Sequence, residues 1–370
     1  MNYSSPLEWQ KAYIRERGLD ALVSSSPDNL AYTIGYVMPS LQLGVRKRRF
    51  AAVVTPDGPD VLLVVTPEFK QAKSDSRISD VRDYNEFTES ATTLLADILR
   101  ELGVARGRVG IEMDYLPARD YLELRSKLPN TRFEDAESTF DRLRMLKTTE
   151  EIARLRHIGG IVHRAHVEAS QVTHPGWTEM QFGNAIRDSV RRQGGEGLNN
   201  LVVASGYRST WSNCAPSQKV LETGEVIKVD VFGFDHGYQS DIARTVAVGN
   251  PTPFQRDIWA RLVEIHSAIL QHVRPGASTN ALWRLFVDEF AARDLTPSIR
   301  FAGHGLGLTL HEEPYISTYS DSLLEENMVL AIEPVTHVNG VGFHIEDEVI
   351  VTADGCELIS DGRGEMLSIT

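Results

Sequence analysis

Residues 225–248 read EVIKVDVFGFDHGYQSDIARTVAV, and this stretch decides the fold of the second half of the chain. Its two ends, Glu225–Phe232 and Asp241–Val248, are rich in valine and isoleucine, which favour strands. Asp235-His236-Gly237 between them is typical of a tight turn, because glycine and short polar residues accept a positive φ. We therefore expect an antiparallel hairpin.

Two acidic residues lie within this hairpin. Counting outward from a turn centred between Asp235 and His236 places Asp230 opposite Asp241, and residues so paired have Cβ atoms about 4.5–5.5 Å apart. Two partly buried carboxylates at that distance repel each other unless they share a proton or a cation. Taken alone, the pair is also compatible with a solvated position on an exposed hairpin, so a second signal is needed.

A second predicted hairpin repeats this placement of acids. Asn339-Gly340, a strong turn signal, separates Val329–His337 from Gly342–Thr352. Glu333 ends an apolar run in the first strand, and Glu346 lies in the second. Strand alternation places three polar residues on one face, namely His344, Glu346 and Glu348. Acids in two strand-forming segments favour a shared cation over coincidence.

Residues 303–314, GHGLGLTLHEEP, supply a nitrogen ligand. Glycines on both sides of His304 let the backbone pack closely, which suits a ligand in a crowded site. Four carboxylates balance the charge of two divalent ions, and oxygen ligands with one imidazole favour Mn²⁺, Co²⁺, Fe²⁺ or Zn²⁺. Two ions about 3.5–4 Å apart can generate a bridging hydroxide and polarise a carbonyl. The predicted ligands are Asp230, Asp241, His304, Glu333 and Glu346.

The chain as a whole predicts two domains. Strand-like and helix-like stretches alternate within residues 1–145, which is typical of an α/β domain. A capping-box pattern at Thr148 begins a long amphipathic helix, and similar signals at Thr178 and Thr252 begin two more. Helices interspersed with antiparallel hairpins predict an α+β fold for residues 146–370.

Composition narrows the class of protein. The 370 residues include 42% hydrophobic and 24% charged residues, an ordinary globular balance. A net charge of −13 makes nucleic acid and anionic lipid poor partners. The start, Met1 to Gly18, has no apolar segment of a signal peptide, and no apolar run approaches the ~20 residues of a membrane span. With only two cysteines, these features predict a cytoplasmic protein that does not bind membranes.

The ordered acids and histidine resemble those of the pita-bread metallopeptidases, a family that includes aminopeptidase P, prolidase and creatinase. The resemblance implies a C-terminal pita-bread fold, a creatinase-type α/β N-terminal domain and a homodimer. It further implies a dinuclear metal-dependent hydrolase, most closely an Xaa-Pro dipeptidase or aminopeptidase. It rests on the segments Val229-Asp230, Gly237–Thr245, Gly303-His304-Gly305-Leu306-Gly307, Ile332-Glu333-Pro334 and Ile345-Glu346-Asp347.

The resemblance also implies roles for the matching residues. Asp230 is expected to bind one ion and His304 the other, while Asp241 and Glu346 bridge both ions. Glu333 is expected to complete the shell of the second ion and to carry a proton from the water to the leaving amine. A further catalytic residue, expected to hydrogen-bond the substrate or the tetrahedral intermediate, is His311.

Three positions depart from the pattern of the proline-specific relatives. Asn213, Arg300 and His344 stand where histidine, histidine and arginine are usual. We expect all three to contact the substrate together with His311. Arg300 favours a carboxylate if it faces the pocket, and the alternative is a surface residue at the start of a strand. The departures leave open a non-peptidase enzyme on the same scaffold, such as a creatinase-like C–N hydrolase or a dimethylsulfoniopropionate-type lyase. In either case the expected partner is a small peptide or a small metabolite.

Overall fold

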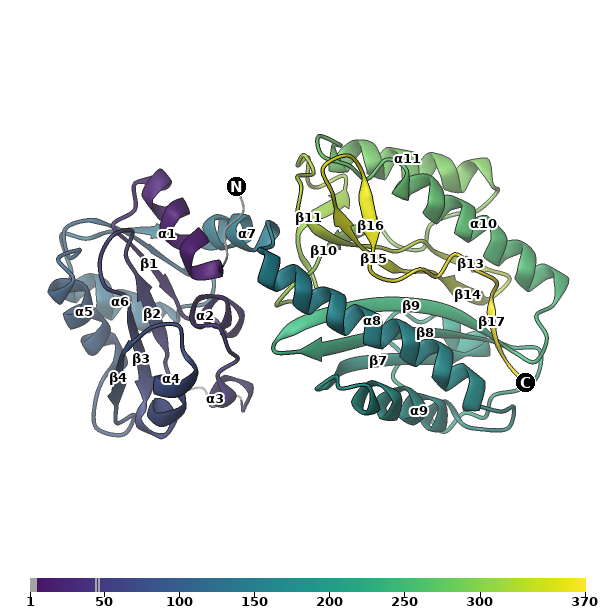
Figure 1. The fold of residues 1–370 in the computed structure, drawn as a ribbon, viewed down its shortest axis with the longest axis horizontal. Helices are drawn as coiled ribbons and strands as arrows, with labels where there is room; N and C mark the ends of the chain where they lie inside the picture. The colour runs from purple at the N-terminus through teal and green to yellow at the C-terminus, as the bar shows by residue number, and fades with distance from the viewer. Residues whose placement is uncertain (1–4, 44, 46) are drawn as a thin grey trace. The chain divides into compact units, whose positions relative to one another are not determined.

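The structure is a computed structural model that describes residues 5–43, 45 and 47–370, so the first four residues of the segment from Met1 to Gly18 lie outside the described residues. The chain divides into two compact units, Met1–Arg144 and Met145–Thr370 (Figure 1). The helices that precede the long helix of the second unit are α1 (Pro6–Arg17), α2 (Pro27–Ile34), α3 (Pro39–Gln42), α4 (Phe69–Asp75), α5 (Ala91–Glu101), α6 (Ala118–Lys127) and α7 (Glu137–Met145).

The first unit is built on one mixed sheet. Its strands are β1 (Ala21–Ser24), β2 (Ala51–Val54), β3 (Val61–Val65), β4 (Asp80–Tyr84), β5 (Arg108–Ile111) and β6 (Arg132–Asp135). They lie in the order β4-β3-β2-β1-β5-β6, and β2 runs antiparallel to both of its neighbours. Valine, leucine and isoleucine side chains of the central strands form one buried core with α2 and α5, as expected for an α/β domain.

The second unit contains four helices and two main sheets. The helices are α8 (Thr149–Val172), α9 (Glu179–Arg192), α10 (Pro253–Leu270) and α11 (Thr279–Ala292). One sheet has the order β17-β9-β8-β7, with β7 (Gly197–Ser205), β8 (Val226–Asp235), β9 (Tyr238–Val248) and β17 (Leu367–Ile369). The other has the order β11-β10-β12-β15-β16, with β10 (Phe301–Gly305), β11 (Glu312–Ser317), β12 (Val329–Ile332), β15 (Asp347–Val351) and β16 (Cys356–Leu358).

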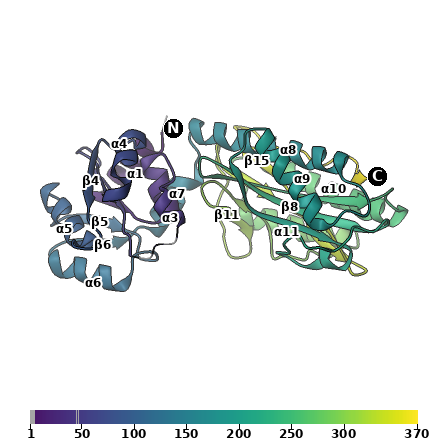
Figure 2. The same ribbon diagram turned by 90° about the horizontal axis from the view of Figure 1, so that it is seen from below.

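Helices cover the outer faces of these sheets (Figures 1 and 2). The predicted capping boxes at Thr148, Thr178 and Thr252 are confirmed, and each begins a helix. Helices α8 and α9 bury their apolar sides against β7, β8 and β9, while α10 and α11 pack in a second core. The inner, polar faces of the sheets are thereby left to face each other. No helix among the described residues is long and apolar enough to cross a membrane.

The first hairpin forms as predicted, but its register differs. His236 and Gly237 both have positive φ, of 50° and 86°, and form a two-residue turn. Asp235 therefore pairs with Tyr238, and Asp230 lies opposite Ala243 rather than opposite Asp241. The predicted pairing was wrong by two residues because the turn is centred one residue later. A shift of two preserves the face, so the two acids are diagonal neighbours on the same side.

The second hairpin is interrupted where its acids lie. Strands β13 (Val335–Val338) and β14 (Val341–His344) pair around the predicted Asn339-Gly340 turn, and β12 pairs with β15 in the same register. Between the two pairings Pro334, which has no N–H to donate, breaks the ladder. By this register Glu333 lies across from Glu346 at the break.

Candidate metal centre

The structure brings together the five residues predicted as metal ligands. Asp230 comes from β8, Asp241 from β9 and His304 from β10, while Glu333 follows β12 and Glu346 precedes β15. The Nε2 atom of His304 lies 3.3 Å from Glu333 Oε1, 3.7 Å from Asp241 Oδ2 and 3.9 Å from Glu346 Oε1. All five side chains are buried. The cluster therefore joins both sheets at one point between their inner faces.

The backbone around His304 determines the direction of its ring. The Nδ1 atom lies 2.9 Å from the Gly305 carbonyl oxygen, and an Nδ1–H that donates there leaves Nε2 with a lone pair facing the carboxylates. A side chain at Gly303 would collide with the Ala331 carbonyl, and one at Gly305 would collide with Glu313. The close packing that we predicted for these glycines is thus confirmed.

The donor set fits a divalent cation. In the described part of the chain, five buried atoms around the cluster have no hydrogen-bond partner: Asp230 Oδ1, Asp241 Oδ1, His304 Nε2, His344 Nε2 and Glu346 Oε1. Buried polar atoms are rarely left without a partner, since each such atom costs free energy. Three groups of side chains also place one ligand atom each within 4.8 Å of one another: Asp230, His344 and Glu346; His304, Glu333 and Glu346; and Asp241, His304 and His311. Metal coordination would satisfy these atoms together.

The electrostatics of the cluster lead to the same conclusion. Burial raises the pKa of Asp230 to about 7, and the charge of Glu333 adds to the effect. Burial also raises the pKa of Asp241 and of Glu346 well above their ordinary values, with neighbouring carboxylates as the next cause. Without a cation these acids hold protons that free carboxyl groups release. Divalent ions would supply the missing positive charge and let the carboxylates ionise.

The cluster forms the base of a cavity of about 480 Å³, which is the size of a small-molecule site. Apolar walls accompany the acids, formed by Phe232, Ile299, Phe301, Leu310 and Val335. His311 also lines the cavity, and its exposed ring stacks on that of His304 with 3.7 Å between centroids and 10° between planes. His311 therefore lies in the cavity beside a predicted metal ligand, where a contact with the substrate is possible.

The three departures from the family pattern have different positions. Asn213 is an exposed residue of the cavity wall, and His344 lies buried at its base. Arg300 is exposed and is absent from the described residues that line the cavity, although Ile299 and Phe301 on either side are present. Alternation where β10 begins explains the difference, because neighbours in an extended chain point to opposite sides. The structure does not bring Arg300 to the site.

Sequence reasoning missed Lys228, which lies in the cavity wall with only 4% of its surface exposed. Its Nζ donates to the carbonyl oxygens of Trp211 and Ser212, at 2.5 and 3.0 Å. Burial lowers the pKa of Lys228, and the charge of Asp230 opposes that shift. Lys228 lies two residues before Asp230 in β8, and alternate residues of a strand share a face. The sequence could therefore have indicated that Lys228 lies on the side of Asp230.

Glu348 was expected on the same face as Glu346, but it has a different role. Its Oε1 accepts a hydrogen bond from the backbone N–H of Asp241 at 2.6 Å, and it is absent from the described residues that line the cavity. The register is the same on both sides of the break, so alternation still places Glu348 toward β9, as it does Glu346. Glu348 thus supports the strand that carries Asp241.

A buried arginine, Arg244, hydrogen-bonds the backbone of Glu346 and the side chain of the next residue. Arg244 donates to the Glu346 carbonyl at 2.5 Å and to Asp347 Oδ1 at 2.6 Å, and it is 3% exposed. Although burial raises the pKa of Asp347, Arg244 and His266 outweigh burial and hold it below its ordinary value. The backbone N–H of Glu346 also donates to the Ala243 carbonyl at 3.0 Å. These contacts fix the position of Glu346 between the sheets.

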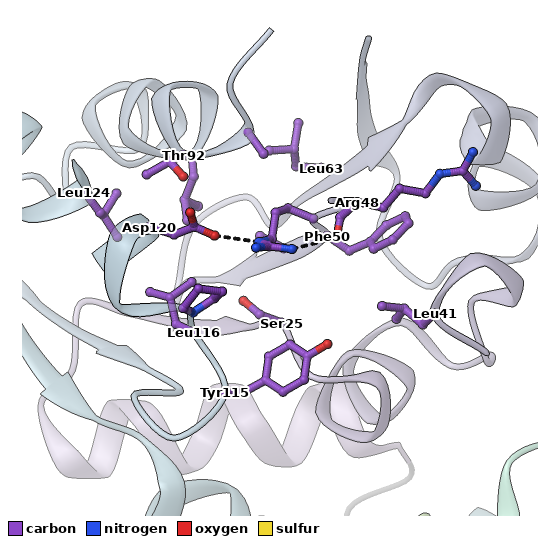
Figure 3. Close-up of a pocket in the computed structure, with 15 residues that line it drawn as sticks. Ser25, Leu41, Arg48, Phe50, Leu63, Thr92, Tyr115, Leu116, Asp120 and Leu124 are labelled. Carbon is purple, nitrogen blue, oxygen red and sulfur yellow. Dashed lines mark hydrogen bonds and ion pairs between the residues drawn. The ribbon is translucent and has the colours of Figure 1, made fainter. Parts of the chain in front are cut away.

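A second cavity lies in the first unit, beside an ion pair (Figure 3). Arg49 Nε donates to Asp120 Oδ2 at 2.6 Å, and residues such as Phe50, Leu116 and Tyr115 line the remaining wall. Its volume is about 40 Å³, close to the space that one water occupies. This cavity is too small for a peptide, so the cavity of the second unit is the site that we consider.

The fold and the donor set are those of a metal-dependent hydrolase. Residues 153–353 match Metallopeptidase family M24, and residues 8–146 match the Creatinase/Prolidase N-terminal domain. The chain belongs to Metallopeptidase family M24, a metal-dependent family of hydrolases. The predicted pita-bread fold with a creatinase-type N-terminal domain and the predicted enzyme class are thereby confirmed.

Individual relatives match over nearly the whole chain. An Xaa-Pro dipeptidase of Lactobacillus helveticus is 29% identical over 96% of this chain and 95% of its own length. An Xaa-Pro dipeptidase of Pyrococcus furiosus is 27% identical over 98% and 99%. Among solved structures, dipeptidase PepE from Mycobacterium ulcerans has a TM-score of 0.83 at 28% identity, covering 98% of this chain and 97% of its own. An X-Pro aminopeptidase from Thermotoga maritima, at 24% identity, covers 100% of both chains with a TM-score of 0.85 and shows the same fold.

Proposed function

We propose that this protein is an Xaa-Pro dipeptidase with a dinuclear metal centre. The observation that carries the proposal is a buried cluster in which His304 Nε2 faces Asp241, Glu333 and Glu346, and these three acids line one cavity together with Asp230. Relatives named Xaa-Pro dipeptidase support the same activity. The proposed ions are Mn²⁺, Co²⁺, Fe²⁺ or Zn²⁺. The proposed ligands are Asp230, Asp241, His304, Glu333 and Glu346.

Bound divalent ions at such a site supply Lewis acidity to the scissile carbonyl and lower the pKa of the nucleophilic water. Glu333 belongs both to the ligand cluster and to the cavity wall. From there its carboxylate takes the proton of the water and passes it to the leaving amine. The stacked ring of His311 is partly desolvated, which lowers its pKa to about 4. A neutral His311 donates one hydrogen bond to the developing oxyanion.

The cation in the cavity wall favours a dipeptide over a longer peptide. Among the described residues that line the cavity, Lys228 is the only lysine or arginine. An ammonium group has three N–H donors, and two of those of Lys228 reach the carbonyls of Trp211 and Ser212. The third donor and the charge would bind the free carboxylate of a dipeptide. This role replaces the one that we expected of Arg300.

Assays with defined peptides test the proposal. The protein loaded with two equivalents of Mn²⁺ or Co²⁺ is expected to cleave Xaa-Pro dipeptides, and Asp241→Ala to abolish cleavage. Asp257→Ala is the matched control, because Asp257 is an exposed helix residue paired with Arg261. Failure to cleave any proline dipeptide with two ions bound would contradict the assignment.

The role of Lys228 has its own test. Lys228→Met is expected to raise KM for a free dipeptide while leaving KM for the corresponding dipeptide amide unchanged, since only the free dipeptide carries the carboxylate. An equal rise for both substrates would refute carboxylate binding by Lys228.

The names of the relatives do not favour the alternative of a creatinase-like hydrolase or a lyase on this scaffold. We also propose a homodimer in the cytoplasm, as the family resemblance and the composition suggested. Light scattering of the purified protein tests the first expectation, and cell fractionation tests the second.

A further inference from the structure

His344 is a second buried imidazole at the base of the cavity. It ends β14, and 4% of its surface is exposed. Thr245 fixes its backbone on both sides, because the Thr245 hydroxyl accepts from the His344 N–H at 2.8 Å and donates to its carbonyl at 3.0 Å. Within the described residues its Nε2 atom has no hydrogen-bond partner. A buried nitrogen held this firmly and left unsatisfied requires an explanation.

The nitrogen of His344 faces the two glutamates of the cluster. Its Nε2 lies 3.5 Å from Glu346 Oε2 and 3.7 Å from Glu333 Oε2. The other oxygen of each glutamate faces His304, at 3.9 Å for Glu346 Oε1 and 3.3 Å for Glu333 Oε1. Each carboxylate therefore lies between two imidazoles and directs one oxygen to each.

These separations suit ligands of a common ion better than hydrogen bonds. An N–H···O bond is about 2.7–3.2 Å long, which is shorter than either distance from His344. Two ligands at about 2.1 Å from one ion lie up to about 4.2 Å apart, and both distances fall below that limit. Asp230, His344 and Glu346 also bring their ligand atoms within 4.8 Å of one another.

We propose that His344 is a sixth protein ligand of the metal centre. It binds the ion on the Asp230 side, and His304 binds the other, so that each ion has one imidazole. The inference rests on the metal centre of the proposed function, and it replaces the substrate contact that we expected of His344. Imidazole ligands suit Zn²⁺ and Fe²⁺ better than Mn²⁺, which carboxylates suit. We therefore expect the site on the Asp230 side to prefer Zn²⁺ or Fe²⁺ over Mn²⁺.

X-ray absorption of the Co²⁺-loaded protein, after its bound metal has been counted, tests this ligand without relying on activity. The wild type with two ions is expected to show one imidazole per ion, and His344→Asn to show one imidazole per two ions. In a metal titration, His344→Asn is also expected to lower the affinity of the protein for the second ion by at least about tenfold. His337→Asn is the control, because His337 lines the same cavity without a close approach to the predicted ligands and should leave the count unchanged.

The outcomes separate this inference from the proposed function. One imidazole per two ions in the wild type, with both ions bound, would overturn the role of His344 while leaving the dinuclear centre intact. A wild type that binds no second ion would overturn both. If His344→Asn does not fold, His311→Asn decides, because His311 is the other histidine whose ligand atom reaches the cluster in the described part of the chain. One imidazole per ion in both the wild type and His311→Asn assigns the second imidazole to His344, and a loss of one imidazole in His311→Asn would overturn that assignment.

Discussion

Removal of the metal should make the stability of this protein fall as pH rises. Burial raises the pKa of Asp230 to about 7 from an ordinary value of 3.8. At low pH this carboxyl is protonated in both the folded and the unfolded chain. Between about pH 4 and pH 7 the unfolded chain releases the proton while the metal-free folded chain retains it, so rising pH favours unfolding. Above pH 7 the folded group ionises too, and the loss becomes constant.

The size of the effect follows from the shift of Asp230. The difference is about 3 pKa units, and each unit corresponds to about 1.4 kcal/mol. Asp230 alone therefore lowers the free energy of unfolding by roughly 4 kcal/mol between pH 4 and pH 7. In a domain of this size 1 kcal/mol shifts Tm by about 2–4 °C, so the expected fall is about 8–16 °C. The raised pKa values of Asp241 and Glu346 act in the same direction.

Differential scanning fluorimetry of EDTA-treated protein from pH 4.5 to 8 measures this fall. Added Mn²⁺ should restore the melting temperature at pH 7.5, because the ion binds the ionised carboxylates. Asp230→Asn should flatten part of the pH dependence, whereas Asp257→Asn, which changes an exposed acid, should not. A metal-free melting temperature that stays level or rises over this range would refute the reasoning.

Three further substitutions have defined outcomes. Arg244→Met leaves Asp347 buried without its cation and should lower the free energy of unfolding in urea by about 3–5 kcal/mol. Gly303→Ala should lower Tm and metal affinity, because its methyl group meets the Ala331 carbonyl, whereas Gly355→Ala meets no atom within 4 Å. Glu333→Gln should retain the fold in circular dichroism yet lower kcat by at least about 100-fold, and unchanged turnover would exclude the proton transfer.

Local signals in the sequence predicted much of the fold. A capping box such as that of Thr148 lies within four residues, and the Asn339-Gly340 turn requires positive φ at two adjacent residues. The glycines beside His304 likewise indicated close packing before the backbone was seen. Because each signal acts over a few neighbouring residues, its outcome depends little on the rest of the molecule.

The predicted ligand set also followed from the sequence, since its five residues are identified by their order and their flanking residues. The sequence did not predict which neighbours each of these side chains contacts. The turn at His236-Gly237 shifted the pairing of Asp230 by two residues. At the start of β10, Ile299 and Phe301 line the cavity, whereas Arg300 between them is absent from the described residues of its wall.

Strand alternation places Lys228 and His344 on faces shared with predicted ligands, but only the tertiary structure showed what their side chains meet. A strand pattern states which residues share a face, but the packing of one sheet against another decides what that face meets. The sequence by itself therefore determined the elements of this protein and the residue types of its proposed metal centre. Tertiary packing decided which side chains surround that centre, because the neighbours come from strands far apart in the chain.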